Sequence, residues 1–282
     1  MTNRTDDLAL PRSLTCERCG TGFSCTLSGD CWCMAEPVQL PMPAVGGGDC
    51  LCPDCLRAAA NVAWQVDAVL LDMDGTLLDT ERVYLASLDT ALQSMGYTDG
   101  AALGHAMIGI PGPECELMLM KHYGADFPLS ALNDAYVIRR DEMFRAGMPL
   151  KPGAVELLDA LRTAACKVAL VTSSGRATAE AHLAAGGIRA HFETVLTRDD
   201  VARGKPYPDL YLLAAQRLGV PPAACVAIED SGPGIAAAHG AGTIPIMVPD
   251  ILAPSAETIA QCAAVVPDLH AALALLKTRG GL

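Results

Sequence analysis

The chain has 282 residues, of which 51% are hydrophobic, and it carries a formal net charge of −12. The hydrophobic content excludes a disordered chain, and the negative charge argues against nonspecific attraction to nucleic acid or to an anionic membrane surface. No apolar run approaches the roughly 18 residues that a membrane span needs, and the start of the chain lacks the apolar core of a signal peptide. We therefore expect a cytoplasmic protein with no nucleic-acid or membrane partner.

Clustered cysteines mark the beginning of the chain as a separate module. Eight of the twelve cysteines fall before residue 56, and this segment contains no histidine. A tetrahedral metal site here therefore has only sulfur ligands. We predict a tail over residues 1–12 and a zinc-binding module over 13–60 with two Zn²⁺ sites, where bound metal supplies much of the folding free energy. The predicted ligands are Cys16, Cys19, Cys25, Cys31, Cys33, Cys50, Cys52 and Cys55.

This module resembles the cysteine-rich CWC family, named for a Cys-Trp-Cys signature that residues 31–33 form here. The closing segment Cys50-Leu-Cys52-Pro-Asp-Cys55-Leu56 is part of the resemblance, which implies metal binding but no defined activity. Residues 1–66 hold four arginines, no lysine and seven acidic residues, which is not the basic footprint of a nucleic-acid-binding module. A protein partner or self-association is the expectation that remains. Free thiols in a poorly ordered tail are the alternative to a metal site.

The rest of the chain alternates short apolar strands with helices. The first strand, Ala68–Leu71, precedes a stretch whose pattern is entirely helical, with amphipathic helices at 114–123 and 129–146. Further strands are predicted at 167–171, 194–196, 225–228, 244–248 and 264–266. Short strands separated by helices specify the α/β class with a doubly wound parallel sheet. We predict a Rossmann-like core domain over 66–79 and 148–282, interrupted by an all-helical cap over 80–147.

Polar side chains follow three of the predicted strands at their carboxyl ends. They are Asp72, Asp74, Thr172, Ser173, Glu229 and Asp230. Parallel strands bring these ends to one edge of the sheet, where open α/β sheets bind ligands, and Lys205 lies on a loop that can reach the same edge. Clustered carboxylates repel one another unless a cation lies among them, and oxygen ligands favour Mg²⁺. The set predicts a site for a phosphate group and Mg²⁺.

Four motifs in this order resemble those of the haloacid dehalogenase superfamily of phosphatases. They are D-x-D-G-T at 72–76, Thr-Ser at 172–173, G-K-P at 204–206 and E-D at 229–230. The resemblance covers residues 66–282. The helical insertion looks like the small cap of the branch that contains phosphoglycolate phosphatase, β-phosphoglucomutase and sugar-phosphate phosphatases.

The resemblance implies a role for each matching residue. Asp72 would be the nucleophile that forms an aspartyl-phosphate, and Asp74 would protonate the leaving group and then deprotonate water. Thr172, with the backbone N–H groups of Ser173 and Ser174, would hold phosphoryl oxygens, while Lys205 would neutralise the phosphoryl group and the nucleophile. The implied Mg²⁺ ligands are Asp72, the backbone carbonyl of Asp74, Glu229 directly or through water, and Asp230.

These roles predict Mg²⁺-dependent hydrolysis of a small phosphorylated metabolite, such as a sugar phosphate or a phosphoglycolate-like compound. A phosphosugar mutase is the alternative enzyme, but Tyr84 stands where such mutases carry histidine, and residues 110–114 lack an expected arginine. A zinc-dependent interaction module with a regulatory phosphatase-like domain is the alternative of another class. Arg176 is expected either to touch a substrate phosphate or to be a solvated residue of a surface helix.

Overall fold

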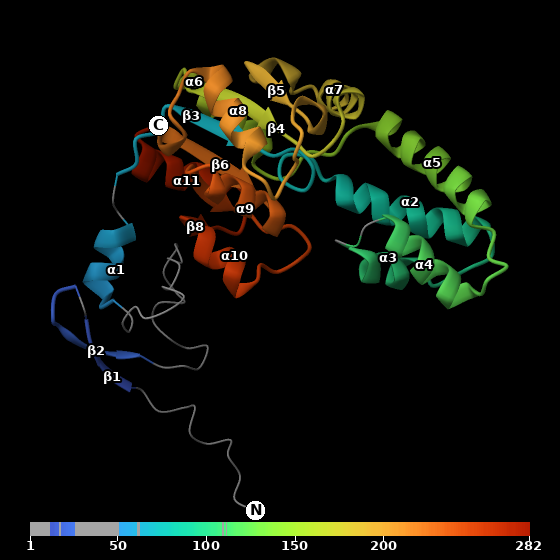
Figure 1. Cartoon of the computed structure of the whole chain (residues 1–282), viewed down its shortest axis with the longest axis horizontal. Coiled ribbons are helices and arrows are strands. Elements are labelled where there is room, and N and C mark those ends of the chain that lie inside the picture. The colour runs from blue at the N-terminus through green and yellow to red at the C-terminus, as the bar shows by residue number, and fades with distance from the viewer. Residues whose placement is uncertain (1–11, 17, 26–50, 61–62, 109, 111) are drawn as a thin grey trace, which may run out of the picture.

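A six-stranded parallel sheet forms the centre of the molecule (Figure 1), in the order β5-β4-β3-β6-β7-β8. The computed structural model describes residues 12–16, 18–25, 51–60, 63–108, 110 and 112–282. The strands of this sheet are β3 (Ala68–Leu71), β4 (Lys167–Val171), β5 (Thr194–Leu196), β6 (Cys225–Glu229), β7 (Ile244–Met247) and β8 (Ala264–Val265). The predicted fold class is confirmed, and each predicted strand is observed to within one residue at either end.

Helices cover both faces of the sheet. They are α6 (Ala154–Thr163), α7 (Arg176–Ala185), α8 (Asp209–Leu218), α9 (Gly232–Gly240), α10 (Ala256–Gln261) and α11 (Leu269–Gly280), with short 3₁₀ helices η2 (Arg189–His191), η3 (Arg198–Asp200) and η4 (Pro222–Ala224). Val69 and Leu71 of β3 pack with α6, α7 and α11, whereas Ala68 and Leu70 pack with α8 and α9 on the other face. Burial on both faces explains why this strand is an uninterrupted apolar run.

The register of the central strands places their polar ends side by side. Leu71 of β3 pairs with Leu170 of β4 on one side and with Ile228 of β6 on the other. The next residue, Asp72, therefore comes level with Val171 and Glu229. Strand order reverses around β3, and such a switch point is where α/β sheets bind ligands.

Of the helices that the described residues form between β3 and β4, the four that precede α6 gather beside the carboxyl ends of the strands (Figure 1). They are α2 (Thr80–Ser94), α3 (Gly100–Met107), α4 (Gly112–Tyr123) and α5 (Leu129–Ala146). These helices have a small core of their own, built around Leu92, Leu119 and Leu132. The prediction at 129–146 is confirmed, while α3 was missed because its Gly- and Ala-rich sequence has no clear apolar face.

Asp79, the residue before α2, makes ion pairs rather than a side-chain cap. Asp79 occupies the N-cap position but its side chain accepts no capping hydrogen bond. Its carboxylate lies instead 3.1 Å from Arg82 and 3.5 Å from Lys151. The carboxylate therefore ties the first turn of α2 to the segment that leads into α6.

The N-terminal segment contributes an antiparallel hairpin, β1 (Arg12–Thr15) and β2 (Gly22–Cys25), and the helix α1 (Pro53–Ala60). Trp64, which follows α1, meets the C-terminal helix: its backbone N–H donates to the Arg279 carbonyl, and the Arg279 guanidinium lies 4.4 Å from its ring centre. Three predicted zinc ligands, Cys31, Cys33 and Cys50, lie outside the described residues. No helix in the described ranges is both long and apolar enough to cross a membrane.

Candidate active site

Lys205 occupies the centre of the carboxyl edge of the sheet. Its ammonium donates to Asp72 Oδ1 (2.5 Å), to Glu229 Oε1 (2.5 Å) and to the Val171 carbonyl (2.8 Å), which uses all three N–H groups. Burial alone lowers the pKa of Lys205, but the two carboxylates outweigh burial and raise its pKa above the ordinary value. Lys205 is therefore a fixed positive charge that joins the ends of β3, β4 and β6.

Glu229 is fully buried and is held by protein donors at both of its oxygens. The Tyr211 hydroxyl donates to Oε1 at 2.7 Å, and the Ser231 hydroxyl donates to Oε2 at 3.0 Å. Gly234 lies against the carboxylate, where an added Cβ would come within 2.0 Å of it. Sequence reasoning missed Tyr211, because it sits at an apolar position of α8 and resembles any core residue.

Asp72, Glu229 and Asp230 each bring a carboxylate oxygen to a common point, with all three oxygens within 4.8 Å of one another. Burial and the charge of Glu229 raise the pKa of Asp72, and the same two causes raise the pKa of Asp230 to about 7. One ammonium is thus too little positive charge for three carboxylates. An oxygen-only donor set with excess negative charge fits a hard divalent cation such as Mg²⁺.

Two residues of the first motif shape the position of Asp230. The Thr76 hydroxyl donates to Asp230 Oδ1 at 3.1 Å. Gly75 has a φ of +82°, and a Cβ there would lie 2.4 Å from Asp230 Oδ2. Glycine is therefore required at this position both by the backbone conformation and by the close approach of the carboxylate.

Asp74 lies apart from this group and faces different neighbours. Its Oδ2 accepts a hydrogen bond from the Ser174 hydroxyl at 2.7 Å, and its Oδ1 lies 3.8 Å from His182 Nδ1. Burial raises the pKa of Asp74, but the polar contacts of His182, Ser174 and Thr80 outweigh burial and lower it overall. The two aspartates of the D-x-D motif therefore have different surroundings although only one residue separates them.

The segment after β4 supplies the hydroxyl groups of the site. Thr172 is buried, and its hydroxyl accepts the Ser174 backbone N–H at 3.0 Å, while Ser173 is exposed. Arg176 donates to Asp200 (2.5 Å) and to the Val195 carbonyl (3.0 Å). These contacts tie α7 to β5 and to η3, so protein acceptors engage the guanidinium although the Arg176 side chain stays 42% exposed.

Four cysteines form a second cluster in the N-terminal segment. The sulfur atoms of Cys16, Cys19, Cys52 and Cys55 all lie within 4.8 Å of one another, and those of Cys19 and Cys52 are 3.5 Å apart. Ligands at about 2.3 Å from a tetrahedral Zn²⁺ stand about 3.8 Å apart, so the spacing fits this ion. Cys25 is not part of this group.

The ionisation of these thiols also fits a cation. A backbone hydrogen bond from Cys52 is the largest influence that lowers the pKa of Cys16, to about 6, whereas hydrogen bonding with Cys19 and burial raise the pKa of Cys55 to about 12. The four sulfurs cannot all become thiolates at neutral pH without a positive charge among them. The two Cys-x-x-Cys pairs come from the hairpin and from the start of α1, so one ion would join both ends of the module.

A parallel sheet whose carboxyl edge gathers acids, hydroxyls and one buried lysine defines an α/β enzyme. The model of the haloacid dehalogenase-like hydrolase family matches residues 66–242. The chain belongs to this family, which confirms the predicted resemblance for the core. The N-terminal cysteine segment precedes the matched residues.

Related proteins named for an activity include phosphatases and a putative β-phosphoglucomutase of Thermotoga maritima, whose structure superposes with a TM-score of 0.67 at 30% identity, covering 75% of this chain and 99% of that one. A Drosophila melanogaster protein named probable pseudouridine-5'-phosphatase is 34% identical over 199 residues, which cover 68% of this chain and 85% of that protein. The phosphorylated carbohydrates phosphatase of Thermotoga maritima is 31% identical over 177 residues, covering 63% and 82%. A hydrolase of the family from Deinococcus radiodurans R1, solved with bound phosphate and sodium, superposes with a TM-score of 0.65 at 30% identity, covering 76% and 96%.

Proposed function

We propose that the protein is a Mg²⁺-dependent phosphatase that hydrolyses a monoester of a small phosphorylated metabolite through an aspartyl-phosphate on Asp72. The observation that carries this proposal is the separation of the two aspartates. Asp72 is bound to Lys205 within the carboxylate group, whereas Asp74 lies outside it beside hydroxyl and imidazole groups. This separation supports attack on phosphorus by Asp72 and proton transfer by Asp74.

The proposed reaction has two steps. In the first, an Asp72 oxygen forms a bond to phosphorus, the bond from phosphorus to the leaving-group oxygen breaks, and Asp74 gives that oxygen a proton. In the second, Asp74 takes a proton from water as the water oxygen attacks phosphorus, and the bond to Asp72 breaks to release inorganic phosphate. The arriving phosphate dianion raises the pKa of Asp74 by charge repulsion, which favours the protonated form that the first step needs.

The charges of the site support these steps. Lys205 neutralises Asp72 and an incoming phosphoryl oxygen. Asp72, Asp230 and the backbone carbonyl of Asp74 would hold Mg²⁺, which supplies charge neutralisation to the phosphate when bound. Glu229 would act mainly through Lys205, because Tyr211 and Ser231 already donate to its oxygens.

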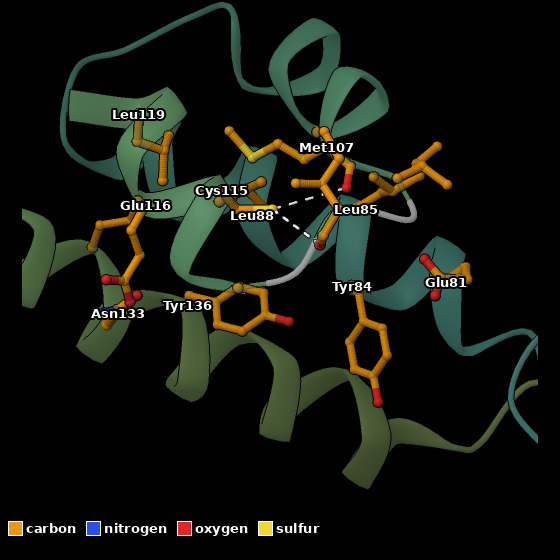
Figure 2. Close-up of a pocket in the computed structure, with 15 residues that line it drawn as sticks. Glu81, Tyr84, Leu85, Leu88, Met107, Cys115, Glu116, Leu119, Asn133 and Tyr136 are labelled. Carbon is orange, nitrogen blue, oxygen red and sulfur yellow. Dashed lines mark hydrogen bonds between the residues drawn. The ribbon is translucent and has the colours of Figure 1, made fainter. Parts of the chain in front are cut away.

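The helices between β3 and β4 offer a place for the leaving group. A cavity of about 350 Å³ lies among α2, α3, α4 and α5, and Figure 2 shows Tyr84 and Glu81 of α2 and Tyr136 of α5 along it. Glu81 and Ile108 also line a second cavity of about 390 Å³ that reaches Asp230. Hydroxyl and carboxylate groups between apolar walls suit a hydroxylated metabolite.

The test is Mg²⁺-dependent release of p-nitrophenol from p-nitrophenyl phosphate. Asp72→Asn removes the nucleophile and is expected to abolish release. Asp67→Asn is the matched control, because Asp67 is exposed and precedes the same strand at its opposite end. Equal rates for Asp72→Asn and the wild type would contradict the proposal. If only the wild type is active, a screen of phosphorylated metabolites identifies its substrate.

One observation favours a phosphosugar mutase as the second candidate. A cavity of about 680 Å³ lined by Tyr84 and His182 also contains Arg145, whose guanidinium group suits a second phosphate, and Arg140, which is paired with Asp141. A mutase converts a sugar monophosphate to its isomer when primed with a bisphosphate, whereas a phosphatase releases inorganic phosphate from it. Product analysis after incubation with glucose 1-phosphate and glucose 1,6-bisphosphate separates the two.

We also propose that Cys16, Cys19, Cys52 and Cys55 bind Zn²⁺. The second predicted zinc site, which needs the other four cysteines, stays a prediction. Protein purified without added metal is expected to contain one zinc ion per chain for the first site and two if both sites form. Metal-free protein with all thiols titratable would contradict both.

A further inference from the structure

Three buried polar atoms meet around Asp74 without a hydrogen-bond partner among the described residues. They are Asp74 Oδ1, Thr80 Oγ1 and His182 Nδ1. Buried polar groups rarely stay unpaired, because each loses its hydrogen bonds to water. His182 Nδ1 lies 3.8 Å from Asp74 Oδ1, so a small rotation of either side chain brings the two within hydrogen-bond distance.

His182 also links Asp74 to the helices above the site. It comes from α7 and is buried, and its ring lies 4.6 Å from that of Phe144 on α5. The Phe144 ring in turn lies nearly perpendicular to that of Tyr84 on α2, with 5.8 Å between the ring centres. A movement of α5 toward the sheet would therefore press directly on the imidazole.

We infer that His182 is a positioning residue for Asp74, a conclusion that rests on the proposed function. With substrate bound, the Nδ1–H group donates to Asp74 Oδ1 and fixes one carboxylate oxygen. Oδ2 then remains on the side of Ser174, which lies in the phosphate-binding segment. His182 thereby directs the proton-carrying oxygen of Asp74 at the leaving group, without itself touching the substrate.

This role has a kinetic signature that a purely structural role lacks. A good leaving group such as p-nitrophenolate departs without help, whereas phenolate needs more protonation in the transition state. General acid catalysis contributes about 10²–10⁴-fold, and misdirection of Asp74 forfeits part of it. Loss of the His182 donor is therefore expected to lower kcat/KM for phenyl phosphate about ten-fold while p-nitrophenyl phosphate changes by less than about two-fold.

The variants separate the donor from the bulk of the side chain. His182→Leu fills the space beside Phe144 without a donor, whereas His182→Asn keeps an N–H group near the place of Nδ1. His191→Leu is the matched control, because His191 also has a buried, unpartnered Nδ1 but lies in η2, beyond the end of α7. If His182→Leu does not fold, His182→Gln replaces it, since its longer side chain moves the donor away from the Nδ1 position.

In His182→Leu we expect kcat/KM for phenyl phosphate to fall relative to kcat/KM for p-nitrophenyl phosphate. The ratio of the two kcat/KM values should be near that of the wild type in His182→Asn and unchanged in His191→Leu. Equal losses for both esters in His182→Leu, or an Asn variant that behaves like the Leu variant, would overturn the inference alone. A wild-type protein that hydrolyses neither ester with Mg²⁺ would overturn the proposed function as well.

Discussion

Replacing Tyr211 by phenylalanine removes one hydroxyl group from a fully buried side chain and retains its ring packing. That hydroxyl donates to Glu229 Oε1 at 2.7 Å. A hydrogen bond to a charged group contributes about 1.5–3 kcal/mol, so we expect the free energy of unfolding to fall by about 2 kcal/mol. In a domain of about 150–250 residues, each kcal/mol shifts the melting temperature by about 2–4 °C, which gives a decrease of about 4–8 °C.

The same substitution should lower activity, because Glu229 shares Oε1 between Tyr211 and Lys205 and therefore fixes the lysine. Thermal unfolding by circular dichroism and hydrolysis of p-nitrophenyl phosphate measure the two effects. Tyr207→Phe is the control: Tyr207 is exposed and meets Arg203 through its ring face, which phenylalanine preserves. A Tyr211→Phe protein that melts at the wild-type temperature would refute the assigned strength of this hydrogen bond.

Three further predictions concern the backbone and the two metal-binding groups. Gly75→Ala should lower the free energy of unfolding by about 1–3 kcal/mol through backbone strain, and it should also abolish Mg²⁺-dependent activity because the new Cβ displaces Asp230. Gly96→Ala is the control: its φ is +91° and nothing lies within 4 Å of the new Cβ, so it should show the loss of stability without the loss of activity. Lys205→Met should lower the free energy of unfolding, measured by urea titration, by about 3–5 kcal/mol, since it leaves buried carboxylates unpaired. A variant as stable as the wild type would show that these carboxylates are protonated instead. Cys55→Ser should abolish zinc binding by the four cysteines while the core domain keeps its melting temperature. A lower melting temperature of the core in this variant would contradict independent folding of the cysteine module and the core.

The sequence by itself determined the layers of the core and the succession of its strands and helices along the chain. Short apolar runs separated by helices specify a parallel sheet, because only strands buried on both faces lack polar alternation. Polar residues directly after such runs must come together at one edge, whatever the details of packing. Asp72, Glu229 and Lys205 were therefore predictable as neighbours, and the structure places them in direct contact.

Tertiary structure alone decided which side chains pair within that neighbourhood. Tyr211 and His182 lie on helices where sequence periodicity marks only a buried face, and their contacts with Glu229 and Asp74 depend on how α8 and α7 dock against the sheet. Likewise, the sequence allows the eight predicted cysteine ligands to be divided between two metal sites in many ways. The fold brings Cys16 and Cys19 together with Cys52 and Cys55. Local patterns fix burial and periodicity because these depend on near neighbours. Contacts between residues far apart in the chain depend instead on strand register and helix docking, which arise only when the whole domain packs.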